Sequence, residues 1–409
     1  EGSGAVLRGA RDLGNGTVML ADNDGRLATG SGFVTSGSYG VPGATYHLKP
    51  TGSGYSVAQS GLFVVGGHHY WGQSNTAAIL KGNLIIDDGL MIADKNTGIL
   101  AWGDGWYVTN AYDKDLQRYY MHTSSKWGVR VAKIGHFVVD GKHYFGLSDT
   151  GYVVRGNQKV GKGLVFADND GVMTWHKGWL VTDKLAGSLE RYYFDEVDSR
   201  GLRGALTGLF TVDGKRYYGR EDTGFVVRGV YVISRFYGNS ANAYGDVWHD
   251  DVVAIGDNDG VLMSRAEFGD RIVRIARTQI GASYTTEDNA YYPNVAFNCS
   301  GLSYWVYDQM GIHIPHNQGY HSYYYQQENI YNSQMYSVEK RGAWKNSTAG
   351  LLPGDLVFFS PVGDKYRTGH VGVYIGNDQM IDCSTGGCYV RNVYGTKGFV
   401  GGGCPITLV

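Results

Sequence analysis

The pattern of apolar and polar residues changes near residue 265. Before this point, short alternating runs end every few residues at turns that contain glycine, as the strands of β-hairpins do. After it, apolar residues first recur at a spacing of three to four and then gather in short runs typical of buried strands. The pattern predicts a multi-domain chain, with an all-β, solenoid-like hairpin array over residues 1–265 and an α+β domain over residues 266–409.

The N-terminal part contains a repeat. The run from Phe137 to Gly146 recurs from Phe210 to Gly219, 73 positions later, and a degenerate copy runs from Phe63 to Gly72. Each copy alternates up to a turn such as Asp-Gly and continues with two aromatic residues, which predicts a hairpin of about twenty residues. A lone hairpin cannot bury its aromatic side chains, whereas stacked hairpins can.

A second repeated element, Ala-Asp-Asn-Asp-Gly, begins at Ala21 and again at Ala167. Its carboxylates suggest calcium, but the element lacks the spacing and the terminal glutamate of an EF-hand loop. Asp, Asn and Gly are also the ordinary residues of tight turns. We therefore predict turns here, with no metal site and no cofactor.

A cysteine opens the second helical pattern of the C-terminal part. After Cys299, the apolar residues Leu302, Trp305, Val306 and Met310 form one stripe that a glycine ends. The N–H groups and the dipole of a helix N-terminus favour a thiolate. A thiolate nucleophile uses a histidine as its ion-pair partner and as the acid for a leaving amine. The alternative is an inert packing residue, the common role of a single cysteine.

A histidine opens a strand about seventy residues further on. Residues 356–359 and 370–375 are predicted to be buried strands, and a hairpin returns the chain through residues 380–384. His370 shares its face with Gly372, which leaves room beside the imidazole. A carboxylate on the returning strand would orient the ring, so Asp382 is the predicted third residue and Ser384 is the alternative.

An earlier helix is predicted over residues 270–280. Asp270 is a suitable cap, and Ile272, Ile275 and Ala276 recur at helical spacing before Gly281. The C-terminal domain is therefore expected to begin near residue 267.

Composition narrows the class of protein. The chain has 409 residues with 63 glycines, 32 tyrosines and only 7 prolines, and 18% of its residues are charged, which argues against a disordered linker. A net charge of −2 gives no footprint for nucleic acid, and no apolar run approaches the roughly 20 residues of a membrane span. The chain starts at Glu1 without methionine, so we expect a processed, secreted protein.

All four cysteines follow residue 298. If Cys299 is a free nucleophile, the others are Cys383, Cys388 and Cys404, which leaves room for one disulfide at most. The two expectations, held equally, are a Cys388–Cys404 disulfide and no disulfide at all.

Three motifs in the C-terminal part resemble the NlpC family of papain-like cell-wall peptidases. They occur in the family's order and run over residues 298–302, 352–359 and 369–376. The resemblance implies a cysteine peptidase with Cys299 as nucleophile, His370 as base and Asp382 as third residue. It also implies that Tyr284 lines the site and that Ser300 helps to bind substrate. The implied substrate is a peptidoglycan stem peptide, often cut between γ-D-glutamate and a diamino acid, without a metal.

The sequence departs from this family at several positions. Asn298 stands where an aspartate is common, Thr285-Thr286-Glu287 replaces Trp-Gly-Gly, and the third residue is more often neutral than an aspartate. A tyrosine-rich insert over residues 320–325 is a substrate wall or, by the favoured interpretation, a packed amphipathic surface.

The N-terminal array resembles choline-binding and glucan-binding cell-wall repeats, which also pair glycine turns with aromatic runs such as the one at Trp106 and Tyr107. The resemblance implies a wall-polymer ligand, either choline or teichoic acid or a glycan. Most of the aromatic residues are expected to be core.

Together these features predict a secreted, wall-associated peptidoglycan endopeptidase that the repeats hold on its substrate. The alternatives are an amidase or acyltransferase on the same scaffold, and a wall-adhesion protein without activity.

Overall fold

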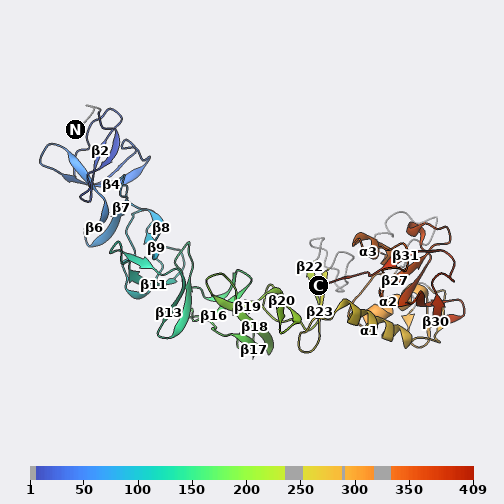
Figure 1. Ribbon diagram of the computed structural model, residues 1–409. Coiled ribbons are helices and arrows are strands. Elements are labelled where there is room, and N and C mark those ends of the chain that lie inside the picture. Colours follow the sequence, from blue (N-terminus) through green and yellow to red (C-terminus); the bar gives the residue numbers. More distant parts are fainter. Residues whose placement is uncertain (1–5, 235–251, 288–290, 317–332) are drawn as a thin grey trace. The chain divides into compact units, whose positions relative to one another are not determined.

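The computed structural model describes residues 6–234, 252–287, 291–316 and 333–409 (Figure 1). The chain divides into two compact units. The first comprises residues 1–160, 165–176 and 198–204, and the second comprises residues 161–164, 177–197 and 205–409. The predicted division at residue 265/266 stays a prediction. None of the helices in the described residues is long and apolar enough to span a membrane.

The first unit holds two five-stranded antiparallel sheets with the same connectivity. In the first sheet the spatial order is β3-β4-β5-β2-β1, and in the second it is β10-β11-β12-β9-β8. The strands of the first are β1 (Gly9–Asp12), β2 (Thr17–Ala21), β3 (Gly32–Ser36), β4 (Ala44–Pro50) and β5 (Ser56–Gln59). Those of the second are β8 (Gly82–Ile86), β9 (Gly89–Ala93), β10 (Gly105–Thr109), β11 (Gln117–Thr123) and β12 (Arg130–Ala132).

The remaining strands of the array continue this repeat. Separate two-stranded hairpins are β6 (Gly61–Val65) with β7 (His68–Gly72), β13 (Gly135–Val139) with β14 (Lys142–Gly146), and β20 (Gly208–Val212) with β21 (Lys215–Gly219). Five further strands follow along the chain with similar lengths, namely β15 (Gly156–Val160), β16 (Gly163–Ala167), β17 (Gly178–Thr182), β18 (Glu190–Glu196) and β19 (Arg203–Leu206). Within the second unit, β17 pairs with β18, and Gly163 and Leu164 of β16 pair with Leu206 and Ala205 of β19. The predicted hairpin array is confirmed, with its hairpins grouped into larger sheets that the sequence did not reveal.

The small hairpins turn at the predicted Asp-Gly pairs. Both turn residues have positive φ, 49° and 72° at Asp140 and Gly141 and 50° and 74° at Asp213 and Gly214. This is the two-residue turn that suits the twist of a hairpin, and Asp-Gly and Gly-Gly are the pairs that adopt it readily. The Ala-Asp-Asn-Asp-Gly elements are also turns, because Asp168 Oδ1 accepts the backbone N–H groups of Asp170 and Val172 at 2.9 and 2.8 Å.

Four aromatic rings form a closed cluster in each of three copies. Neighbouring ring centroids lie 4.7–5.8 Å apart, so the rings pack on one another. We call these the ring clusters; they are Phe33/His47/Phe63/Tyr70, Trp106/Tyr120/Phe137/Tyr144 and Trp179/Tyr193/Phe210/Tyr217. In the second cluster Phe137 and Tyr144 are 7% and 4% exposed, which agrees with the expectation that most aromatic residues are core.

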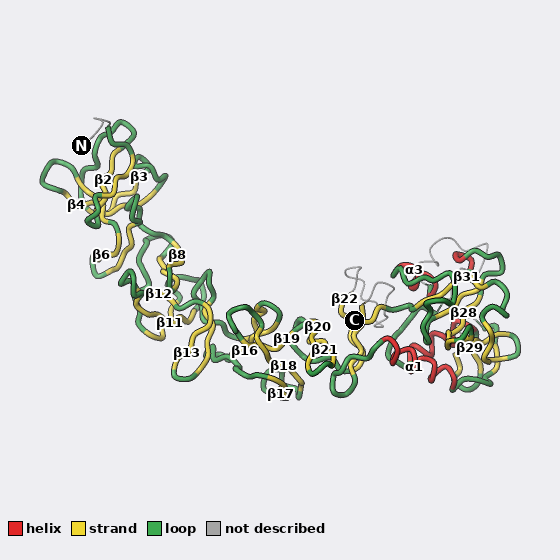
Figure 2. The backbone as a smooth tube through the Cα atoms, viewed as in Figure 1, coloured by secondary structure: helices red, strands yellow, loops and turns green. Residues whose placement is uncertain are grey.

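The C-terminal part carries the helices, while strands and loops make up the array (Figure 2). Its five-stranded sheet has the order β30-β29-β28-β27-β31. The strands are β27 (Leu356–Phe359), β28 (His370–Gly376), β29 (Gln379–Ser384), β30 (Gly387–Asn392) and β31 (Phe399–Gly403). The helices are α1 (Arg265–Arg277), α2 (Cys299–Asp308), α3 (Gln334–Lys340) and the short 3-10 helix η2 (Lys365–Arg367).

Helix α2 packs on β28 and β29, and α1 packs on α2. The shared core includes the predicted stripe residues Leu302 and Val306, which are 1% and 0% exposed, with Val371 and Val373 of β28 facing them. Three short strands precede α2, namely β24 (Ser283–Tyr284), β25 (Tyr291–Tyr292) and β26 (Ala296–Phe297). The packing places the first turn of α2 beside the start of β28.

The start of α1 corrects one prediction. The helix begins at Arg265, and its cap is Ser264, not Asp270. Ser264 accepts the N–H of Glu267, and the Glu267 carboxylate accepts the N–H of Ser264 at 2.8 Å, which is a capping box. The chain before α1 ends in β22 (Gly229–Ser234) and β23 (Val252–Gly256), and the C-terminal strand β32 (Thr407–Leu408) pairs with β23 in parallel.

Candidate active site

Cys299 is the first residue of α2, and Asn298 caps the helix. The Asn298 side chain accepts the N–H of Gly301 at 2.6 Å. The N–H of Cys299 has no acceptor within the helix, because the first four amides of a helix lack one. Cys299 is 8% exposed. The site therefore has an oriented thiol with free amides and the positive end of a helix dipole beside it.

The amide of Asn298 also holds the loop that precedes the helix. Its Nδ2 donates to the backbone carbonyl of Glu287 at 3.1 Å. An aspartate would cap the helix equally well, but it has no donor for this carbonyl. Asn298 therefore explains one departure from the expected motif, since it ties the Thr285–Glu287 segment of this chain to α2. The Glu287 carboxylate in turn accepts the hydroxyl of Tyr292 at 3.1 Å.

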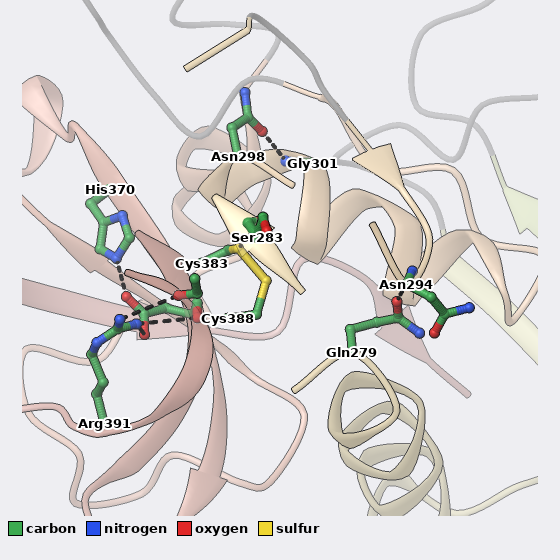
Figure 3. The surroundings of a disulfide bond; sticks show 11 residues. Gln279, Ser283, Asn294, Asn298, Gly301, His370, Cys383, Cys388 and Arg391 are labelled. Carbon is green, nitrogen blue, oxygen red and sulfur yellow. Dashed lines mark hydrogen bonds and ion pairs between the residues drawn. A yellow bond between two sulfur atoms is a disulfide. The ribbon is translucent and has the colours of Figure 1, made fainter. Parts of the chain in front are cut away.

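The structure brings His370 and Asp382 together. His370 Nε2 lies 2.6 Å from Asp382 Oδ2, and Asp382 is 1% exposed (Figure 3). Gly372 makes this approach possible, because a Cβ there would lie 3.2 Å from the Asp382 Cβ and 2.7 Å from Met380 Sδ. The room that Gly372 leaves is thus filled by β29. Asp382, and not Ser384, is the residue with a hydrogen bond to the imidazole.

His370 is held in its protonated form. Burial lowers its pKa, but hydrogen bonds to Asp382 and Cys299 and the attraction of both groups outweigh that effect and raise the pKa to about 9. An imidazolium within hydrogen-bond reach of a thiol is the arrangement that stabilises a thiolate nucleophile.

Tyr284 interacts with the Cys299 thiol from β24, and Ser300 follows Cys299 in α2. Strand β24 pairs with β26 so that Tyr284 is level with Phe297, and burial and the Cys299 thiol raise the Tyr284 pKa. Tyr284 is 36% exposed, so it borders the site and keeps its phenolic proton for hydrogen bonding. Ser300 is only 2% exposed, and its hydroxyl lies 3.5 Å from Asn298 Oδ1. The substrate-binding roles of both residues stay predictions.

Two residues of the site were missed by sequence reasoning. Arg391 Nη1 lies 2.5 Å from Asp382 Oδ1, on the side away from His370 (Figure 3). Gln334 of α3 is fully buried; its Nε2 donates to the carbonyl of Ser300 at 3.1 Å and its Oε1 accepts the Ser303 hydroxyl at 2.7 Å. A second donor to Asp382, such as Arg391, could have been expected, because a buried carboxylate accepts hydrogen bonds from more than one donor. No pattern in the sequence pointed to Gln334.

Residues 281–398 match the NlpC/P60 family. The C-terminal part is an NlpC/P60 domain. The matched range contains Cys299, His370 and Asp382 but none of the repeat array.

Curated relatives match the same region. Over 127 residues the chain is 30% identical to a probable endopeptidase p60 of Listeria seeligeri. The matched region covers 31% of this chain and 19% of that protein. Over 128 residues it is 35% identical to a probable endopeptidase of Mycobacterium bovis. That matched region covers 31% of this chain and 26% of the relative. The chain thus spans about a fifth to a quarter of the length of these relatives.

Solved structures align with each part. The NlpC/p60 domain of the peptidoglycan hydrolase SagA is 24% identical and covers 33% of this chain and 97% of that chain, with a TM-score of 0.24. Choline binding protein F from Streptococcus pneumoniae is 18% identical and covers 61% of this chain and 76% of that chain, with a TM-score of 0.26. Scores this low do not establish a shared overall arrangement.

The disulfide of the NlpC/P60 domain differs from both expectations. Cys383 and Cys388 are bonded, with Cα atoms 4.0 Å apart, and Cys299 and Cys404 are free (Figure 3). The register pairs Cys383 of β29 with Cys388 of β30. Cys404 follows β31, at the opposite edge of the sheet from β30, so a Cys388–Cys404 bond is excluded by the strand order. The predicted tyrosine-rich insert at residues 320–325 lies outside the described residues.

The thiols are expected to differ in reactivity. The Cys404 thiol lies inward beside Arg265 and Asp355, and burial raises its pKa, whereas Cys299 has the His370 imidazolium beside it. Iodoacetamide at neutral pH should therefore label Cys299 at least tenfold faster than Cys404 in the native protein, as measured by peptide mass spectrometry. After denaturation without reductant two thiols should react, and after reduction four. A third labelled thiol before reduction would contradict the Cys383–Cys388 bond.

Asp382→Asn should lower the pH at which His370 loses its proton. The variant removes a carboxylate that raises the His370 pKa to about 9, while the opposing effect of burial remains. We expect the midpoint to fall by about one unit or more, measured by histidine NMR with the resonance assigned by its loss in His370→Ala. Ser384→Ala is the matched control and should leave the midpoint in place. An unchanged midpoint in Asp382→Asn would show that the carboxylate does not act on the imidazole.

Proposed function

We propose that the NlpC/P60 domain is a cysteine peptidase that cuts peptidoglycan stem peptides, with the bond between γ-D-glutamate and a diamino acid as the expected target. The observation that carries the proposal is the pair of partly buried His370 and buried Asp382, beside a thiol on a helix N-terminus. Support comes from relatives named probable endopeptidases over the same region.

The proposed chemistry is acyl transfer through a thioester. The Cys299 thiolate attacks the peptide carbonyl, a C–S bond forms, and the C–N bond breaks as His370 gives its proton to the leaving amine. The Cys299 N–H and the Tyr284 hydroxyl would hold the oxyanion, since one is an unpaired helix amide and the other keeps its proton. A water molecule then hydrolyses the thioester, and His370, now neutral, takes a proton from this water. Asp382 holds the imidazole in the orientation that each step needs.

We further propose that the array binds a polymer of the cell wall and that the protein acts as a secreted, wall-associated enzyme. Half-buried tryptophans outside the ring clusters support this: Trp102 stacks on His69 at 3.6 Å, and Trp175 stacks on His143 at 4.0 Å. Flat aromatic faces held rigid in this way are suited to sugar rings, at little cost in side-chain entropy.

The second and third ring clusters favour a glycan or teichoic acid over choline. The chain's own guanidinium groups lie over the tryptophans, with Arg118 3.8 Å from the Trp106 centroid and Arg191 3.9 Å from the Trp179 centroid. Arg118 is fixed there by Asp170, and Arg191 by Asp259. A quaternary ammonium would have to displace these internal cations to use the same ring faces.

Cys299→Ala should lower the release of free amines from purified peptidoglycan at least about a thousandfold, because the variant lacks the thiol that forms the thioester in the proposed reaction. Mass spectrometry of the muropeptides from the wild-type digest identifies the bond. Cys404→Ala is the matched control and should digest as the wild type does. Retained cleavage in Cys299→Ala would refute the nucleophile. If the wild-type digest contains new N-acetylmuramoyl ends, the enzyme is an amidase. If the wild type binds walls without cleaving them, the protein is an adhesion protein.

The Cys299→Ala variant of the whole 409-residue chain should pellet with intact walls and remain bound through a wash with choline, because Arg118 and Arg191 already cover the rings of Trp106 and Trp179. Walls stripped of teichoic acid then separate the two remaining ligands: retained pelleting indicates a glycan, and lost pelleting indicates teichoic acid. Elution by millimolar choline would contradict the argument from the internal arginines, and no pelleting at all would contradict wall binding.

A further inference from the structure

Asp382 is a buried carboxylate with a different cation on each oxygen. Its Oδ2 accepts from His370 at 2.6 Å and its Oδ1 from Arg391 at 2.5 Å. Figure 3 shows His370 and Arg391 on opposite sides of the unlabelled side chain between them, each joined to it by a dashed line. The two partners come from the strands on either side, since β29 lies between β28 and β30.

The arginine is held independently of the histidine. Arg391 Nη1 also donates to the backbone carbonyl of Asp382 at 3.3 Å, and Nη2 donates to that of Gly387 at 3.3 Å. The Cys383–Cys388 bond closes the same hairpin between these residues. The guanidinium is therefore fixed to β29 and the following turn whether or not His370 carries a proton.

We propose that Arg391 is a positioning residue that keeps Asp382 charged throughout the reaction, so that the orientation of His370 does not depend on its own proton. The inference rests on the proposed function, in which His370 passes its proton to a leaving amine.

The reason lies in what remains after that transfer. If Arg391 were absent, Asp382 would be a buried carboxylate without a cation once His370 is neutral, and burial strongly favours the protonated form of a carboxylate. A protonated Asp382 would turn from acceptor to donor toward His370 Nε2, which reverses the ring's hydrogen bonding. Arg391 stays charged at every working pH, so it removes that outcome.

Charged and titratable groups from residues 252–287, 291–316 and 333–409 lie near the pair. From the elements packed against it, Asp382 meets His370 of β28 and Arg391 of β30, and beyond the imidazole lie Cys299 of α2 and Tyr284 of β24. Arg391 therefore supplies a charge that does not change with pH, whereas the neighbouring side chains named here can gain or lose a proton.

The direct test is the protonation of Asp382 in Arg391→Met. The carboxyl 13C resonance of Asp382, assigned by its absence in Asp382→Asn, should titrate at least one pH unit higher in the variant than in the wild type, a tenfold gain in proton affinity. Arg391→Lys should recover most of the difference, because it restores the charge. Arg271→Met removes an exposed arginine of α1 and should leave the midpoint unchanged. Equal midpoints in Arg391→Met and wild type would overturn the inference.

Activity gives a second, separable reading. In Arg391→Met the acid limb of the pH profile of kcat/KM on peptidoglycan should move to higher pH. In the Asp382→Asn background there is no carboxylate charge to preserve. Adding Arg391→Met to Asp382→Asn should therefore leave the acid limb where it is. An equal loss at all pH values that persists in the Asp382→Asn background would mean that Arg391 only supports the hairpin, and the inference would fail. If the wild type cleaves nothing while the carboxyl midpoint still moves, the proposed function fails and the role of Arg391 stands.

Discussion

The arrangement of the NlpC/P60 domain depends on one buried charge. A carboxylate with 1% exposure is stable only when its oxygens are paired, because the loss of hydration costs several kcal/mol per ion. Asp382 meets this constraint by its place on β29, which has a neighbouring strand on each side that supplies a cation. Gly372 is part of the same solution, since a larger residue would push β28 away from Asp382. Removal of either cation would leave a buried charge poorly compensated.

The Cys299 thiol is placed by a second set of contacts, which meets the first set in the core. Leu302 and Val306 fix α2 against β28, Asn298 caps its first turn, and Gln334 binds the carbonyl of Ser300 from α3. Because the thiol is on the first residue of α2 and the imidazole on the first residue of β28, the packing of this helix on this strand sets their separation. Few degrees of freedom remain for the pair, which is what catalysis by orientation requires.

Sequence reasoning reached those features that depend on local pattern. The strand at residues 356–359, the strand from His370 and the return through residues 380–384 follow from alternation and a hairpin turn, and they occur as predicted. Arg391 and the disulfide were missed because both depend on how β30 pairs with β29, and cross-strand register is not contained in either strand alone. Asp270 was chosen as cap from its residue type, although Ser264 and Glu267 carried the fuller capping-box signal.

The array shows how one repeated pattern yields positions with different chemistry. The registers of β3 with β4, β10 with β11 and β17 with β18 place Thr45, Arg118 and Arg191 at equivalent sites. Where arginine is present, it covers a tryptophan and binds an aspartate of a later turn. Where threonine is present, its hydroxyl forms a hydrogen bond with that of Thr35 at 3.0 Å, and the ring at the tryptophan position is Phe33. Phe33 is 44% exposed, so the copy without the internal cation also leaves its ring open to solvent. The backbone repeat therefore fixes where rings can gather, and single substitutions on it decide whether a ring face is covered by the chain or left available to a ligand.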